Sequence, residues 1–121
     1  MKEYFNPRAM KTMYDLDELD NLLIEQEASI IYFSNESCNV CKVLKPKVIG
    51  MVGENYPRVT LIYIDTEKSP LISGQYRVFT IPTILTFFQG KEHSRFSRNI
   101  NLYELEMSLK RPYNLIFGEA D

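Results

Sequence analysis

The sequence predicts an α/β fold in which a central mixed β-sheet carries helices on both faces. Two observations lead to this prediction. Apolar, β-branched runs alternate with amphipathic stretches along most of the chain, an order typical of parallel strands joined by helical crossovers. Near the end, two strand-like runs are separated only by the tight turn Gln89-Gly90-Lys91, which indicates an antiparallel hairpin. The expected order of elements is β-α-β-α-β-α-β-β-α.

Length and composition fit one ordinary globular domain. The chain has 121 residues, of which 45% are hydrophobic and 25% charged, and this is enough to build a core without disulfide staples. The formal net charge of −2 predicts no general attraction to nucleic acid or to anionic lipid. We expect a domain over residues 10–111, preceded by a lead-in over residues 1–9 and followed by a C-terminal tail over residues 112–121.

No segment predicts export or membrane insertion. Residues 1–8 lack the apolar core of a secretory signal, and no apolar stretch approaches the length needed to span a bilayer. We therefore expect a cytoplasmic protein. In that reducing compartment a pair of cysteines is more often catalytic or redox-sensing than structural.

The first elements are a short edge strand over residues 10–13 and an amphipathic helix. Asp15 begins the helix, because its side chain can accept hydrogen bonds from the first-turn amides and Glu18 follows three residues later. Leucines at helical spacing then form one apolar stripe: Leu16, Leu19, Leu22 and Leu23.

Two β-branched or apolar runs predict the central strands, over residues 29–34 and 59–64. Between them lies a helix over residues 38–54, in which Pro46 should cause a kink or the loss of a hydrogen bond. Asp65, at the end of the second central strand, is expected to be a turn or capping residue.

A short helix and a hairpin follow. Ser69 and Pro70 suit the cap and first helical position of a helix that ends near Tyr76. The hairpin strands are expected over residues 83–88 and 92–96.

The last predicted helix begins after Asn101, with Glu104 as its returning partner in a capping box. It is expected to run to about Lys110, where Pro112 stops it.

The two cysteines of the chain, Cys38 and Cys41, stand where a buried strand passes into a helix. Unpaired amides and the positive end of the helix dipole favour a thiolate at such a position. The Cys-x-x-Cys spacing allows two sulfurs on the first turn to form a disulfide, and in a βαβ setting this motif is typical of redox activity. The residues expected on the inner face of this helix are Val40, Val43, Leu44 and Val48.

Two other interpretations of the cysteine pair are possible. A structural zinc site needs four ligands, and the chain offers only these two cysteines and the distant His93, so we predict no metal. The cysteines could also be ordinary core residues, since a free cysteine packs as a small hydrophobe. Their place at a polar helix start argues against this.

Across residues 10–111 the chain resembles the thioredoxin family. Pro82 follows Cys41 by 82 − 41 = 41 residues, which is the spacing that the resemblance would require. Five features occur in the family's order: the Cys38-Asn39-Val40-Cys41-Lys42 motif, Pro46 in its helix, Ile62-Tyr63-Ile64-Asp65, Ile81-Pro82-Thr83 and Phe87-Phe88-Gln89-Gly90-Lys91.

The resemblance implies roles for particular residues. Cys38 would be the attacking thiol, and Cys41 the shielded thiol that resolves the mixed disulfide. The Ile81–Pro82 bond would be cis, and the backbone of Ile81 would pair with an extended substrate. The expected substrate surface also includes Ser37, Asn39 and Val40.

The chain also departs from the family's pattern. Ser37 replaces a tryptophan, and Tyr32 stands where the family has a buried acid that helps deprotonate the second cysteine. A tyrosine with an ordinary pKa of about 10 is a poor proton acceptor at neutral pH, so Glu36 or water is the other candidate. Arg98 lies where the family often has glycine, and there it could favour anionic partners, although an exposed arginine is the simpler interpretation.

The predicted function is that of a thiol–disulfide oxidoreductase that reduces protein disulfides through Cys38 and Cys41. It would need no bound cofactor besides its redox-active disulfide, would act as a monomer, and would receive electrons from a disulfide reductase. The alternative is a binding or adaptor module of the same fold, or a redox sensor with little turnover.

Overall fold

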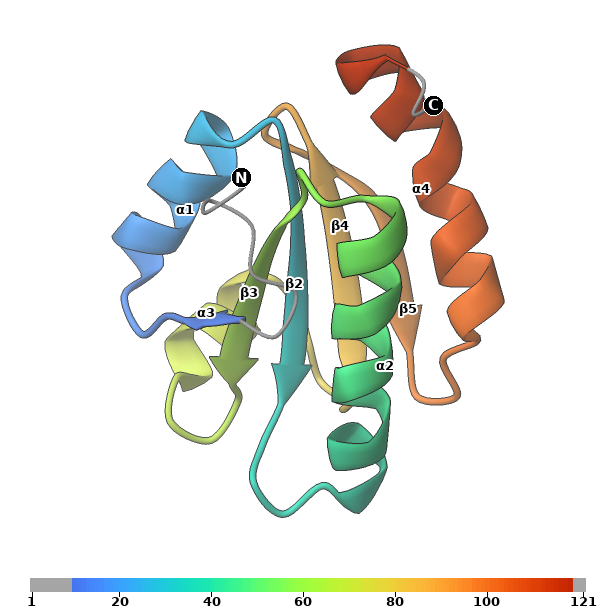
Figure 1. Cartoon of the computed structure of the whole chain (residues 1–121). Helices are drawn as coiled ribbons and strands as arrows, with labels where there is room; N and C mark the ends of the chain where they lie inside the picture. The colour runs from blue at the N-terminus through green and yellow to red at the C-terminus, as the bar shows by residue number, and fades with distance from the viewer. Residues whose placement is uncertain (1–9, 119–121) are drawn as a thin grey trace.

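A computed structural model describes residues 10–118 and shows a mixed five-stranded sheet, with strand order β1-β3-β2-β4-β5 (Figure 1). The β1–β3 and β3–β2 pairs are parallel, whereas β2–β4 and β4–β5 are antiparallel. The predicted lead-in over residues 1–9, and residues 119–121 of the predicted tail, lie outside the described residues. The strands are β1 Lys11–Thr12, β2 Ala28–Ser34, β3 Thr60–Asp65, β4 Thr83–Phe88 and β5 Lys91–Ser97.

Helices cover both faces of the sheet, as predicted; α1 and α3 lie on one side in Figure 1, and α2 and α4 on the other. Alternation along β2 supplies both layers, because successive side chains of a strand point to opposite faces. Ile30 and Tyr32 belong to the core under α2 and α4, while Ile31 and Phe33 belong to the core under α1 and α3. The helices are α1 Leu16–Glu25, α2 Asn39–Asn55, α3 Pro70–Gln75 and α4 Leu102–Phe117.

Two predicted helix caps are confirmed. The Asp15 carboxylate accepts a hydrogen bond from the Glu18 amide at 2.9 Å, and the Asn101 side chain accepts one from the Glu104 amide at 3.0 Å. Each cap satisfies an amide that has no partner within the helix. The sequence therefore located the starts of α1 and α4 correctly.

The predicted start of α3, with Ser69 as cap and Pro70 opening the helix, is confirmed. Ser69 occupies the N-cap position of α3, but its hydroxyl is buried and has no partner among the described residues. Asp65 orders this segment instead, because its carboxylate accepts from the amides of Glu67 at 2.9 Å and Lys68 at 3.1 Å. Asp65 is thus a turn residue, as expected.

The predicted end of the last helix is wrong, because α4 continues through Pro112 to Phe117. Proline cannot donate a hydrogen bond to the carbonyl four residues earlier. That carbonyl belongs to Ser108, and Nε2 of His93 lies 3.2 Å from its oxygen. Tyr113 is buried beyond the proline and packs edge-on against Tyr56, with ring centroids 5.0 Å apart. Residues 112–117 therefore continue the domain rather than form a separate tail.

No helix within residues 10–118 has both the length and the apolar character needed to cross a membrane.

Candidate active site

The cysteines occupy the N-terminus of α2, where Cys38 is the N-cap residue and Cys41 lies in the first turn. They form a disulfide, and their Cα atoms are 5.3 Å apart. Their accessibility differs: Cys38 is partly exposed, whereas only 1% of Cys41 is exposed. Of the two cysteines, Cys38 is therefore the more accessible to solvent.

The turn before the cysteines is held by Asn35, a residue that the sequence analysis missed. Its side-chain oxygen accepts from the amide of Ser37 at 3.0 Å and from the Ser37 hydroxyl at 2.9 Å. The Asn35 carbonyl also accepts from the Cys38 amide at 3.4 Å. An asparagine whose side chain accepts a hydrogen bond from the amide two residues later is typical of turns. The asparagine just before the cysteines was therefore the sequence signal from which this turn could have been predicted.

The start of α2 is rich in positive charge. The first three turns of α2 carry Lys42, Lys45 and Lys47, and its first acidic residue is Glu54. Nearby cations and the helix N-terminus both lower the pKa of a cysteine thiol. The local field therefore favours a thiolate at the start of α2, although the chain as a whole is negative.

Pro82 lies at the same edge of the sheet as the cysteines. β4 begins at Thr83, which pairs with Phe33 near the end of β2, and α2 starts from this edge (Figure 1). The Ile81–Pro82 peptide bond is cis. Ile81 and Cys38 are both partly buried against the core cluster that contains Cys41. The structure thus brings the predicted cysteine and proline segments together.

The residues between and around the cysteines are exposed, which corrects one prediction. Ser37 and Asn39 are exposed, and the exposed fractions of Val40 and Val43 are 64% and 61%. The inner face of α2 instead contains Cys41, Leu44, Val48, Met51 and Val52. Val40 and Val43 fall one position before this stripe, so they lie on the flank of the helix.

Tyr32 lies beneath the cysteines and is fully buried. Its hydroxyl donates a hydrogen bond of 2.7 Å to the carbonyl oxygen of Cys41. Burial, and secondarily the neighbouring Tyr63, raise the pKa of Tyr32 well above the ordinary value. The two rings are stacked with centroids 6.2 Å apart, and Nζ of Lys45 lies 4.4 Å from the centre of the Tyr63 ring. Tyr32 is therefore a neutral donor to the backbone at physiological pH.

Glu36, the second candidate for proton transfer, faces the surface. Its side chain is 81% exposed, and its carboxylate lies 3.4 Å from Nζ of Lys68. The pKa of the exposed Lys68 ammonium is raised mainly by this neighbouring carboxylate. The Glu36 carboxylate is therefore paired with Lys68 at the protein surface, whereas Cys41 is buried.

Replacing Tyr32 by phenylalanine is expected to cost about 1 kcal/mol near pH 7, through loss of a buried hydrogen bond. The cost should shrink above pH 10. Because the folded-state pKa of Tyr32 is raised, its proton is retained in the folded protein and lost from the unfolded one, so its contribution to stability falls by up to about 1.4 kcal/mol per pH unit. Urea unfolding between pH 7 and pH 11 measures this, with the exposed Tyr103→Phe as control. A cost independent of pH would contradict the burial argument.

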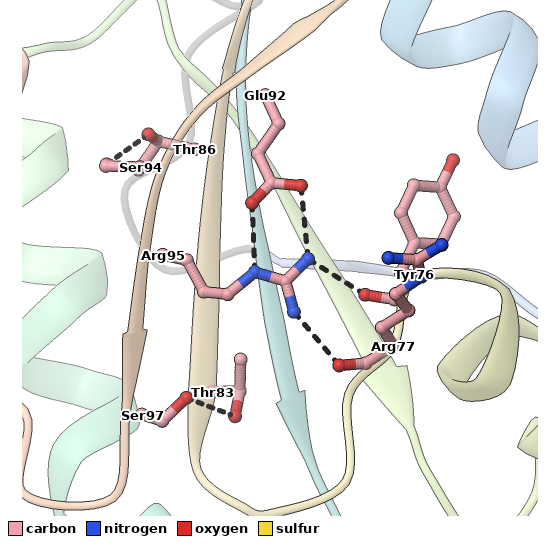
Figure 2. Close-up of polar contacts among 8 residues, drawn as sticks. All are labelled: Tyr76, Arg77, Thr83, Thr86, Glu92, Ser94, Arg95 and Ser97. Atoms are coloured by element: carbon pink, nitrogen blue, oxygen red, sulfur yellow. Dashed lines mark hydrogen bonds and ion pairs between the residues drawn. The ribbon is translucent and has the colours of Figure 1, made fainter.

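Arg95 fixes the loop that leads into Pro82 (Figure 2). Its guanidinium donates to the carbonyls of Tyr76 at 2.9 Å and Arg77 at 3.0 Å, and it pairs with both oxygens of Glu92. These bonds connect the edge strand β5 to the end of α3, where Arg77 has a left-handed backbone with φ of 58°. A planar guanidinium can make all four bonds at once.

Replacing Arg95 by lysine is expected to lower stability by about 1–2 kcal/mol, because an ammonium cannot reproduce the fork and the site is partly exposed. Amide hydrogen exchange over residues 78–81 should also accelerate. Glu92→Gln is the matched control, since it leaves the bonds to the two carbonyls in place. If that variant loosened the loop equally, the carbonyl bonds would not be what holds it.

The described residues contain no group of three or more His, Cys, Asp or Glu side chains suited to a metal ion. The two cysteines are instead bonded to each other. His93, the other residue considered for zinc, lies on β5 beside the carbonyl of Ser108 in α4.

Comparison with known proteins gives one consistent result. The family model described as Thioredoxin matches residues 11–111. The chain is 31% identical to thioredoxin-like protein YdfQ of Bacillus subtilis over 112 residues, covering 93% of this chain and 99% of that protein. It is 30% identical to a thioredoxin of Mycoplasmoides gallisepticum, over 84% of this chain and all of that protein.

Solved structures agree with the sequence comparisons. Oxidised mitochondrial thioredoxin 3 of Saccharomyces cerevisiae superposes with a TM-score of 0.76 at 24% identity, covering 86% of this chain and 96% of that one. Thioredoxin 1 of Thermosipho africanus gives a TM-score of 0.66 at 31% identity, covering 75% and 99%. The mixed sheet with helices on both faces is thus the thioredoxin fold.

Proposed function

Because the chain belongs to the thioredoxin family, we propose that it reduces disulfides in other proteins through Cys38 and Cys41. The observation that carries this proposal is the unequal exposure of the two cysteines at the start of one helix. Cys38 is accessible to a substrate, and Cys41 is one turn away and shielded. This arrangement suits attack by one thiol and resolution by the other.

The reaction proceeds in two exchanges. In the reduced protein, the Cys38 thiolate attacks one sulfur of the substrate disulfide, forming a mixed disulfide and releasing the other substrate sulfur as a thiolate. Cys41, once deprotonated, attacks Cys38, forming the Cys38–Cys41 disulfide and releasing the second substrate thiolate. Two electrons pass to the substrate, and its two thiolates take up protons from Cys41 and from solvent.

The substrate is proposed to lie along the segment before β4. Backbone groups of Ile81 would pair with an extended substrate, which is strand addition next to the sulfurs. Pro82 has no amide hydrogen to donate to a substrate, so the pairing would be made by the backbone of Ile81. Ser37, Asn39 and Val40 are exposed around Cys38 and would form the opposite side of the contact.

In this proposal no carboxylate accepts the proton of the Cys41 thiol. Tyr32 donates its own proton to the Cys41 carbonyl, and Glu36 pairs with Lys68. Water, or the substrate thiolate released in the first exchange, takes the proton. The resolving step is therefore expected to limit turnover.

The oxidised protein must receive electrons before it can act again. A disulfide reductase would return the Cys38–Cys41 pair to the dithiol, and no other cofactor is needed. The cytoplasm is the proposed location, because a reductase of this kind needs a compartment that keeps thiols reduced. The protein is proposed to act as a monomer.

Reduction of insulin with dithiothreitol as electron source tests the function. The wild-type protein should accelerate precipitation of the reduced insulin chains, and Cys38→Ser should show only the rate of dithiothreitol alone. Wild-type protein that gives no acceleration would overturn the proposal.

A redox sensor or adaptor with little turnover is the second candidate. It is favoured because position 32 carries a tyrosine and not a carboxylate. In that case the Cys38–Cys41 disulfide would form and reopen reversibly, but insulin reduction would stay at the background rate. The same assay therefore separates the two functions.

A further inference from the structure

A groove that includes Val40 runs along the flank of α2. We call it the flank groove; its volume is about 560 Å³. Val40, which lies between the two cysteines in the chain, is the lining residue nearest to them in sequence. Its lining comes from α2 and from the turn before α4, and consists of Val40, Val43, Leu44, Lys47, Arg98, Asn99, Ile100 and Asn101.

The flank groove combines an apolar wall with two positive charges. Lys47 and Arg98 line it, and no carboxylate does. Both cations are exposed, and neither forms an ion pair with any residue in the range 10–118. The chain has a net charge of −2, so this concentration of positive charge is local to the site.

Arg98 is held beside the substrate segment by its backbone. Its amide donates a hydrogen bond of 2.9 Å to the carbonyl of Pro82, and its own carbonyl accepts from Ile100 at 3.0 Å. Its φ of 65° is in the left-handed region, which glycine adopts more readily than a residue with a side chain. The fold thus holds the backbone of Arg98 next to Pro82, at a position where glycine would relieve the backbone.

We propose that the flank groove selects disulfide substrates that carry an acidic side chain next to the reactive cysteine. A polypeptide bonded to Cys38 and paired along Ile81 would pass beside Arg98, and Lys47 would continue the positive wall further along α2. A carboxylate there would accept hydrogen bonds from the guanidinium, and the two cations would attract it during encounter. This inference rests on the proposed function and adds a substrate class to it.

Three peptides with one internal disulfide test the preference. They differ only at the residues flanking one cysteine, which are aspartate, serine or lysine, and a quenched fluorophore reports reduction. In single-turnover reactions with the reduced protein, the aspartate peptide should react about 3- to 10-fold faster than the serine peptide, and the lysine peptide more slowly than both. Raising the salt concentration to about 1 M should remove most of the difference.

Two variants test whether the flank groove causes the preference. For each variant, the rate on the aspartate peptide is divided by the rate of the same variant on the serine peptide. Arg98→Gly and Lys47→Gln should each reduce the aspartate-to-serine ratio by about 2- to 3-fold. Lys91→Gln is the matched control: it removes the same charge from β5, at the end of that strand away from Pro82, and should keep the full ratio. Thermal unfolding should show no loss for Arg98→Gly, because glycine suits φ of 65°.

The outcomes separate this inference from the proposed function. Equal reduction of all three peptides by the wild-type protein would overturn the acidic preference and leave the disulfide reductase intact. A preference that survives in both groove variants would overturn the assignment to Lys47 and Arg98. Failure to reduce any peptide would overturn the proposed function, and this inference with it.

Discussion

Cys41→Ser is expected to accumulate covalent complexes with substrates through Cys38, whereas Cys38→Ser should lose disulfide reduction to the background rate. The reason is the unequal exposure of the two cysteines: Cys38 is partly exposed at the N-cap of α2, and Cys41 is buried. Without Cys41 the first exchange still occurs, but the mixed disulfide cannot be resolved. Non-reducing electrophoresis and mass spectrometry of the trapped species measure this directly.

The double variant Cys38→Ser/Cys41→Ser controls for non-covalent association in this experiment. Complexes of Cys41→Ser should disappear with dithiothreitol, and the bonded residue should be Cys38. If Cys38→Ser trapped substrates as efficiently as Cys41→Ser, the assignment of attacking and resolving thiols would be wrong.

Tyr32→Asp is expected to lower the free energy of unfolding by about 3 kcal/mol or more. The change removes a fully buried ring and its hydrogen bond to Cys41, and it buries a carboxyl group in their place. Burial raises the folded-state pKa of such a carboxyl above its unfolded value of about 4, so the destabilisation should grow as the pH rises above 4. Urea unfolding of wild type and variant at pH 4 and pH 7 measures both effects.

The same variant should accelerate the second exchange while leaving the attack by Cys38 nearly unchanged. A carboxylate at position 32 would lie under Cys41, where the wild-type tyrosine cannot accept a proton, and general base catalysis contributes about 10²–10⁴-fold when the pKa is suitable. Rapid mixing with a peptide disulfide resolves the two steps. Tyr32→Asn is the matched control, with similar size and no base. Equal release rates in the aspartate, asparagine and wild-type proteins would show that water already suffices.

Much of the fold was predictable because its signals are local. The caps at Asp15 and Asn101 depend on side chains that bind amides three residues away, and the alternation in β2 follows from strand geometry. The cysteine pair was also predictable, since the strand β2 and the helix α2 are separated only by a short turn that places both cysteines at the helix start. For these features the sequence neighbours are also the spatial neighbours.

The features that escaped prediction depend on contacts between distant parts of the chain. The helix α4 passes Pro112, and His93, on the distant strand β5, lies against the carbonyl that the proline leaves free. Arg95 reaches backbone carbonyls at positions 76 and 77, which no local pattern indicates. The exposure of Val40 follows from the orientation of α2 on the sheet, which the order of apolar residues along the chain does not specify.

The stoichiometry of electron transfer tests the central claim most directly. Fully reduced protein is mixed with an excess of a peptide disulfide, and both are analysed by mass spectrometry after acid quenching. Each protein chain should lose two hydrogens and form the Cys38–Cys41 bond, while one peptide gains two hydrogens. A protein that stays reduced, or that forms only intermolecular dimers, would contradict the account.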